Sequence, residues 1–239
     1  MYLGYAIATL ALLILNTVFL RAVPKTPSSN IQNKEQLSLK QTFQSIKKDR
    51  NLWKFFLSYS IFYGSFQIFG SISNFLIKPF GYKDLTISLS AVSLILLGAV
   101  GAVVSSIFIK RTRNYKLLIT ATTFAGTGIM ILLVCQLFII PNAFITIAIV
   151  GCLGFVVIPV IPNSYEIGCE LAFPIGEAQV TGLLNGGSLI WAFVIDSLLT
   201  LIIGFGDKTK TFIYFVILIG CLCGSSFLYR YTEFHLKRK

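Results

Sequence analysis

The stretch that decides the fold is residues 159–196, PVIPNSYEIGCELAFPIGEAQVTGLLNGGSLIWAFVID. It starts with two prolines at the end of a very apolar run and passes through an acidic segment that lacks Lys and Arg. A second apolar run then begins and carries polar side chains inside it. The acids and polar residues are Glu166, Glu170, Glu177, Thr181, Asn185, Ser188 and Asp196. An acid at the bilayer centre costs about 2.5–3.5 kcal/mol or more, so we expect these residues to have a function.

The composition predicts an all-α integral membrane protein whose first partner is the lipid bilayer. Hydrophobic residues make up 55% of the 239 residues and charged residues 12%, whereas soluble domains contain about 25% charged residues. The sequence offers no metal-ligand cluster, nucleophile–base pair or phosphate-binding loop. We therefore expect no enzyme activity, no cofactor and no metal site.

Seven apolar runs are long enough to cross about 30 Å of hydrocarbon. The first is a retained helix within residues 1–20, and a basic linker over 21–52 follows it. The other six form a unit over residues 53–230, with runs at 53–77, 85–109, 117–140, 143–162, 178–203 and 211–229. The last run is apolar nearly all round, so we expect it to face lipid, and residues 231–239 form a polar tail.

Lys and Arg are distributed unevenly between the two predicted sides of the membrane. With the linker inside, sixteen lie on the inner side and four on the outer side, namely Lys78, Lys83, Lys208 and Lys210. Because these residues concentrate in cytoplasmic loops, we expect the N-terminus outside and the linker and the C-terminal tail in the cytoplasm. This placement explains most of the net charge of +11 without a nucleic-acid partner.

The second part of the linker allows two interpretations. Leu39, Phe43 and Ile46 follow helical spacing after the sequence Ser38-x-x-Gln41, which is typical of a capping box. This favours a short amphipathic helix on the membrane surface. A disordered basic loop is the alternative.

Two of the runs carry polar stripes at helical spacing. One stripe contains Ser60, Gly64, Gln67, Ser71 and Asn74, and the other contains Thr181, Asn185, Ser188, Ala192 and Asp196. Each stripe occupies one face of its helix. We interpret both as lining a water-filled solute pathway, while contact between neighbouring helices through small and hydroxyl residues is the alternative.

A gate is predicted at the inner edge of the membrane. Glu166 and Glu170 lie four residues apart on one helix face, and Glu177 is assigned to the same gate. Across the inner surface lies the only tight basic cluster between helices, formed by Lys110, Arg111 and Arg113. Arg–carboxylate pairs there would close the gate in one conformation. Solvated charges in a loop are the alternative.

Asp196 is the one acid well inside a predicted span. It faces water, is protonated, or is neutralised by a cation, because a bare carboxylate is unstable in hydrocarbon. We favour a cavity-facing carboxylate that attracts a cationic solute or carries a coupling proton. A protonated structural Asp bonded to a hydroxyl of a neighbouring helix is the alternative.

The acidic stretch also carries a family resemblance. The motifs are Ser164-Tyr-Glu-Ile-Gly-Cys-Glu-Leu-Ala-Phe-Pro174, then Glu177, then Gly182-Leu-Leu-Asn185, with a weaker match at Tyr59, Gly64, Phe66 and Asn74. They resemble the feline leukemia virus subgroup C receptor-related family of the major facilitator superfamily, which transports haem or choline and related solutes. The resemblance implies that the chain corresponds to helices six to twelve of a twelve-helix fold.

The resemblance also implies where this chain departs from the family. A tyrosine of the family's choline cage falls on Gln67, a glutamine falls on Leu189, and Asp196 occupies a position that is usually uncharged. These differences point to a different solute or to an ion-coupled step.

Two functions follow as hypotheses. The first is alternating-access transport of a small organic solute together with an N-terminal half from the same gene or a separate chain. The second is a structural subunit of a membrane complex that has no solute pathway.

Overall fold

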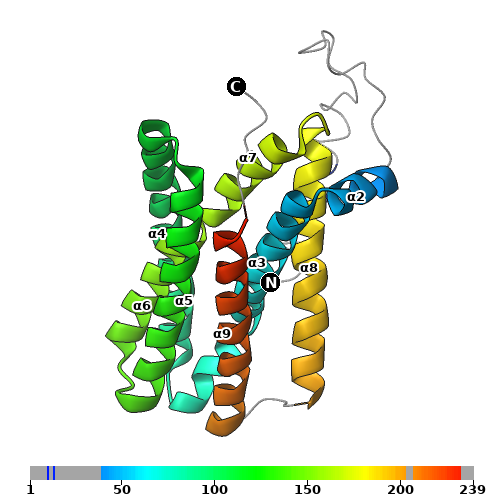
Figure 1. Ribbon diagram of the computed structural model, residues 1–239. Helices are drawn as coiled ribbons and strands as arrows, with labels where there is room; N and C mark the ends of the chain where they lie inside the picture. The colour runs from blue at the N-terminus through cyan, green and yellow to red at the C-terminus, as the bar shows by residue number, and fades with distance from the viewer. Residues whose placement is uncertain (1–9, 11–12, 14–38, 203–206, 233–239) are drawn as a thin grey trace. The chain divides into compact units, whose positions relative to one another are not determined.

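The computed structural model describes Leu10, Leu13 and residues 39–202 and 207–232, and the helices below all belong to one compact unit, Leu37–Lys239. The expected helix at 1–20 and Ser38 of the capping box lie outside the described residues, apart from Leu10 and Leu13. The elements of this unit are shown in Figure 1. They are α2 (Leu39–Lys48), α3 (Arg50–Ile77), the 3-10 turn η2 (Lys78–Phe80), α4 (Asp84–Thr112), α5 (Tyr115–Ile139), α6 (Ala143–Val157), α7 (Val160–Ala172), α8 (Glu177–Ile202) and α9 (Lys208–Arg230).

Short polar side chains start several of these helices. Asp49 caps α3, because its carboxylate accepts the backbone N–H groups of Asn51 and Leu52 at 3.0 and 3.2 Å. Asn114 and Asn142 cap α5 and α6 in the same way. Each cap satisfies backbone donors that the first helical turn leaves free, so each helix begins where the sequence provides an acceptor.

The expected end of the fifth run at residue 162 is wrong. The backbone turns at Ile158 and Pro159, but helix continues through α7 to Ala172, and Ala143–Ala172 is long and apolar enough to cross a membrane as one stretch. Proline is tolerated in the first turn of a helix, where its missing N–H would have no intrahelical partner. Pro159 and Pro162 therefore divide the span without ending it, and the helix carries Glu166 and Glu170.

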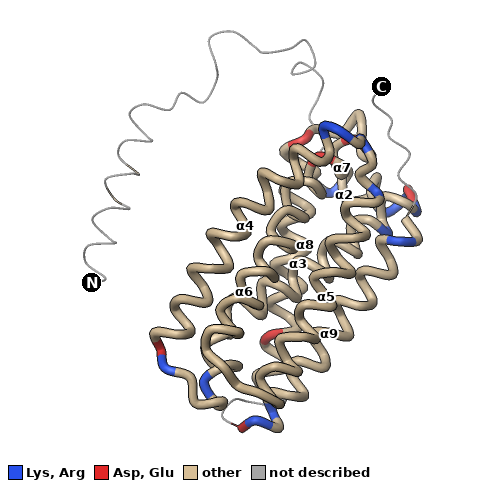
Figure 2. Tube along the Cα trace, turned by 90° about the vertical axis from the view of Figure 1, so that its left-hand side faces the viewer, with Lys and Arg blue, Asp and Glu red and all other residues tan. Residues whose placement is uncertain are grey.

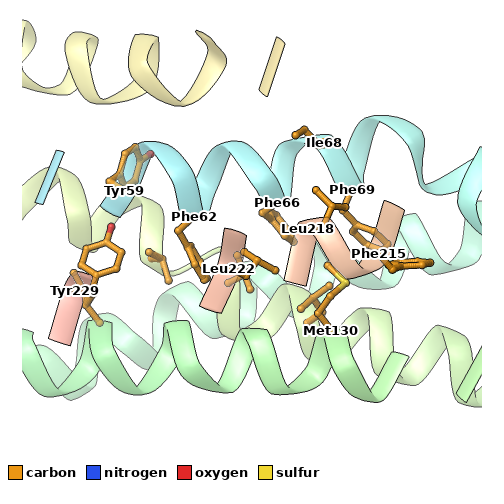
Figure 3. Packing of buried hydrophobic residues seen from close by; sticks show 14 of the residues in the cluster. Tyr59, Phe62, Phe66, Ile68, Phe69, Met130, Phe215, Leu218, Leu222 and Tyr229 are labelled. Carbon is orange, nitrogen blue, oxygen red and sulfur yellow. The ribbon is translucent and has the colours of Figure 1, made fainter. Parts of the chain in front are cut away.

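Helix α3 lies at the centre of the bundle, where it packs against α8 and α9 and also touches α2 and α7. Its buried aromatic side chains meet residues of α9 and α5, as Figure 3 shows for Tyr59, Phe62, Phe69, Met130 and Phe215. The prediction that the last run faces lipid is therefore wrong for one of its faces. That face of α9 is buried against α3 and α5 through Tyr214, Phe215, Leu218, Leu222 and Tyr229.

Helices α4 and α6 are packed backbone to backbone. A methyl group added at Gly101 would overlap the main chain of Phe155, and one added at Gly154 would overlap the main chain of Leu94. Small residues allow membrane helices to approach this closely. The remaining surface of α4 is apolar and exposed, as a surface that meets lipid or another helix would be.

Five helical stretches among the described residues are long and apolar enough to cross a membrane. They are Asp84–Thr112, Tyr115–Ile139, Ala143–Ala172, Glu177–Leu201 and Lys208–Arg230. They match five of the six runs expected in 53–230. The sixth is α3, 28 residues long, whose serines, tyrosines and Gln67 lower its hydropathy and are largely covered by neighbouring helices.

Apart from Asp196 within α8, the charged residues gather at the two ends of the bundle (Figure 2). The end that carries α2 holds ten described Lys and Arg, including Lys110, Arg111 and Arg113. The opposite end, next to η2, holds the other four, Lys78, Lys83, Lys208 and Lys210. The residues assigned to opposite sides of the membrane from sequence thus lie at opposite ends of the bundle.

Candidate functional site

The two predicted polar stripes meet along the contact between α3 and α8. Gln67 of α3 donates from Nε2 to Oγ of Ser188 at 3.4 Å. The indole Nε1 of Trp191, also in α8, donates to Oγ of Ser65 at 3.3 Å. We call this contact the α3–α8 seam and define it by Ser60, Gly64 and Gln67 on α3 and by Gly187, Ser188 and Trp191 on α8.

Two glycines set the width of the α3–α8 seam. A Cβ atom at Gly64 would lie 2.6 Å from the carbonyl oxygen of Ser188, and one at Gly187 would lie 2.5 Å from Oγ of Ser60. Both distances are too short for a methyl group. The helices therefore approach this closely only because these positions lack a side chain, and Ser188 is fully buried as a result.

The stripes divide into a packed part and an exposed part. Ser60, Gly64, Gln67 and Ser188 lie in the α3–α8 seam, where the polar groups of one helix contact the other helix. The exposed residues of the stripes are Ser71, Asn74 and Asn185. Thr181 is half-buried and donates to the carbonyl of Glu177 in its own helix at 2.9 Å. Among the stripe residues, the exposed ones are the most accessible to a solute in this conformation.

Asp196 lies further along α8 and is half-buried. The hydroxyl of Tyr214, which is buried in α9, donates a hydrogen bond to Oδ1 of this carboxylate. Helices α8 and α9 each pack mainly against α3 and contact each other only weakly. The Asp196–Tyr214 bond is therefore a polar bridge between two helices that share little packing.

The predicted gate residues gather at the α2 end of the bundle, but the acids and bases are not paired with each other in this conformation. Glu166 accepts a hydrogen bond at 2.9 Å from the hydroxyl of Tyr115, at the start of α5. The one ion pair with both partners among the described residues joins Lys78 and Asp84 at the other end. At the α2 end, Lys110, Arg111 and Arg113 are exposed, as is Glu177 in the first turn of α8.

Several buried polar atoms of α3 and α7 have no hydrogen-bond partner. Within the part of the chain that the structure describes, Nδ2 of Asn163, Oε2 of Glu170 and Oγ of Ser60 are buried and have no hydrogen-bond partner. Buried polar groups normally find partners, because an unsatisfied one costs about 1–3 kcal/mol. Each of these atoms is a position that a water molecule or a polar group of a solute would stabilise.

Sequence reasoning missed Tyr115, Tyr214 and Trp191. Each is an aromatic residue that donates a hydrogen bond to another helix. Tyr115 and Tyr214 donate to the predicted residues Glu166 and Asp196. Trp191 donates to Ser65, the residue next to Gly64 of the first stripe. Tyr115 lies two residues after the basic cluster, which is a weak signal in the sequence. Tyr214 and Trp191 lie in apolar runs, and only the helix packing shows what they contact.

Comparison with known proteins fits this architecture. The Major Facilitator Superfamily profile matches residues 1–195. An uncharacterized MFS-type transporter of Caenorhabditis elegans is 24% identical over 249 residues, which cover 100% of this chain and 41% of that protein.

Two further relatives have assigned activities. The choline/ethanolamine transporter flvcr2a of Danio rerio is 24% identical, covering 81% of this chain and 43% of the relative. The human choline/ethanolamine transporter FLVCR2 is 22% identical, covering 81% and 38%. The chain thus spans about two fifths of the length of these relatives. They are transporters, in agreement with the expectation that the chain is not an enzyme. The chain is a multi-pass integral membrane protein and belongs to the Major Facilitator Superfamily.

Proposed function

We propose that this chain is the C-terminal part of a transporter that moves a small organic cation across a membrane by alternating access. The observation that carries the proposal is the pair of polar stripes on α3 and α8, which meet at the α3–α8 seam and continue into the exposed residues Ser71, Asn74 and Asn185. In transporters of this architecture the solute binds near mid-membrane between two helical halves. The exposed residues would then face the half that this chain does not supply.

A cation is the proposed solute class for two reasons. Asp196 places a carboxylate inside a span, and the aromatic side chains of Tyr59, Tyr63 and Tyr165 lie near one another on α3 and α7, with ring centroids 5.6 and 5.9 Å from Tyr59. Carboxylates and aromatic faces are the groups that attract organic ammonium ions. The relatives named as choline/ethanolamine transporters support the same class.

The proposed gate uses charges at the α2 end. In the present conformation Tyr115 holds Glu166, and the buried Oε2 of Glu170 has no partner among the described residues. We assign Arg111 and Arg113 to these two acids in the alternate conformation, where the halves close over them. The excess of Lys and Arg at the α2 end supports a cytoplasmic location for this gate.

A structural subunit without a solute pathway is the second candidate. The observation in its favour is that Ser60, Gly64, Gln67 and Ser188 are used in contacts between helices. Such contacts stabilise helix pairs in proteins that transport nothing.

Uptake measurements test the proposed solute class. Cells that lack the gene for this chain, and the same cells with the gene restored, would be compared for uptake of labelled choline and ethanolamine. We expect restoration to raise uptake of at least one amine and Asn185→Leu to abolish the gain. Leu132→Ala on the exposed face of α5 is the control and should retain it. Equal uptake of both amines with and without the chain would exclude this solute class.

A further inference from the structure

Helix α2 is fixed across the end of the bundle by the face that contains Thr42 and Ile46. Both side chains are buried, and Oγ1 of Thr42 donates to Oε1 of Gln179 in α8 at 3.4 Å. Phe43 packs edge-on against Trp53 and Phe56 of α3, with ring centroids 5.7 and 6.3 Å away. The prediction of a helix here is confirmed, but its buried side chains face the protein and not the membrane surface.

The opposite face of α2 is basic. At 100° per residue, Lys40, Gln44, Lys47 and Lys48 fall within an arc of about 100°, turned away from Thr42 and Ile46. All three lysines are exposed, and Gln44, Lys47 and Lys48 line a shallow hollow in the surface. We call these four residues the α2 basic face.

The neighbouring charges strengthen the positive potential of this face. Arg50, at the start of α3, is exposed beside it, and Lys54 follows one turn later. The acid that follows α2 directly in the sequence is Asp49, whose carboxylate is engaged as the cap of α3. The ammonium groups of the α2 basic face are therefore directed to whatever lies outside the bundle, and not to an acid of α2 itself.

The position of the face identifies its partner. Trp53 stacks on Phe56 at the end of α3, and tryptophan in a membrane helix favours the level of the lipid headgroups. The α2 basic face thus lies next to the headgroup layer, on the end of the bundle that carries most of the positive charge. Clustered lysines on an amphipathic helix at this level attract anionic lipid.

We propose that the α2 basic face is a binding site for the headgroup of an anionic phospholipid. Lys47 and Lys48 bind the phosphate in the hollow, Gln44 donates an amide hydrogen bond, and Lys40 extends the positive surface. Since α2 contacts both α3 and α8, a bound lipid also holds α2 in place across the two helices of the α3–α8 seam. The site is independent of any solute that the protein transports.

Energy transfer from tryptophan tests the site directly. The chain contains two tryptophans, so Trp191→Phe leaves Trp53, beside the α2 basic face, as the sole donor. The protein would be placed in phosphatidylcholine nanodiscs that contain a trace of dansyl-phosphatidylserine or of dansyl-phosphatidylcholine. We expect more transfer to the serine lipid, with a preference that falls as salt is raised. Replacing Lys40, Lys47 and Lys48 with Gln should lower the preference by about fivefold or more.

A matched triple variant provides the control. Lys83, Lys208 and Lys210 lie at the opposite end of the bundle, so replacing these three with Gln removes the same charge and should leave the preference unchanged. If Trp191→Phe weakens the fold, native mass spectrometry provides a second measurement. It compares the phosphatidylserine retained by the wild-type chain with the amount retained by each triple variant in which both tryptophans are kept. Equal transfer to both lipids, or an equal loss in both triple variants, would overturn the proposal. If the chain gives no uptake of choline or ethanolamine but keeps its preference for the anionic lipid, only the proposed function is refuted.

Discussion

At the scale of single residues, Asp196 shows how the packing narrows what the sequence leaves open. The sequence identifies an acid inside a span, but it does not identify the donor, because Tyr214 lies 18 residues away in an apolar run. The structure supplies a buried phenol on α9 as that donor. A hydrogen bond contributes about 0.5–1.5 kcal/mol net, and about 1.5–3 kcal/mol where one partner is charged. The carboxylate is thus stabilised within the bundle by a neighbouring helix.

Two substitutions separate the charge of Asp196 from its hydrogen bond. Asp196→Asn keeps an acceptor for Tyr214, so the protein should fold and melt within a few degrees of wild type. Because the negative charge is lost, uptake of the cation should fall about tenfold or lose its dependence on pH. Tyr214→Phe keeps the charge and should instead lower the free energy of unfolding by about 1–2 kcal/mol. Normal uptake with an unchanged pH profile in Asp196→Asn would exclude a role in transport.

At the scale of helices, the sequence predicts where the helices lie along the chain more successfully than which helices contact each other. The runs at 85–109 and 117–140 correspond closely to α4 and α5, because long apolar segments have few alternatives in a membrane. The division at Ile158 and Pro159 was misread, since a proline stops some helices and merely opens the first turn of others. The meeting of the two stripes could not be derived, because spacing along one helix does not reveal which neighbour its face contacts.

The α3–α8 seam predicts opposite effects for two glycines of the same helix. A methyl group at Gly64 would overlap the main-chain oxygen of Ser188, which cannot rotate away, so Gly64→Ala should destabilise the protein by about 1–3 kcal/mol. A Cβ atom added at Gly70 would have no neighbouring atom within 4 Å, so Gly70→Ala should be neutral or up to about 1 kcal/mol stabilising. Unfolding in detergent measures both. Equal changes in the two variants would show that α3 and α8 are not in close contact.

The link between α5 and α7 can be measured with a double-mutant cycle. Tyr115→Phe removes the donor and Glu166→Ala removes the acceptor of the 2.9 Å hydrogen bond, so the double variant should be more stable than the sum of the single effects predicts, by about 0.5–2 kcal/mol. Arg111→Gln combined with Glu166→Gln should show coupling only under conditions that favour the alternate conformation. Strict additivity of Tyr115→Phe and Glu166→Ala would mean that the contact contributes nothing to stability.

At the scale of the whole molecule, the exposed apolar surfaces of α4 and α8 agree with a chain that spans about two fifths of its relatives. Large residues such as Ile95 and Phe193 are 64% and 74% exposed, which only lipid or another helical unit would tolerate. The polar residues Asn74 and Asn185 are exposed as well. Lipid would cover the apolar residues, whereas a solute pathway would keep the polar ones wet.

The measurement that tests this account most directly is the reactivity of single cysteines with a charged, water-soluble thiol reagent in intact membranes. The five native cysteines would first be replaced. We predict that cysteines at Asn74 and Asn185 react at rates comparable with a control at Lys83. Cysteines at Phe193, which lipid or another helical unit would cover, and at Ser188, which is sealed in the α3–α8 seam, should be protected. Protection of Asn74 and Asn185 together, with Lys83 labelled, would contradict a water-accessible solute pathway and favour the structural subunit.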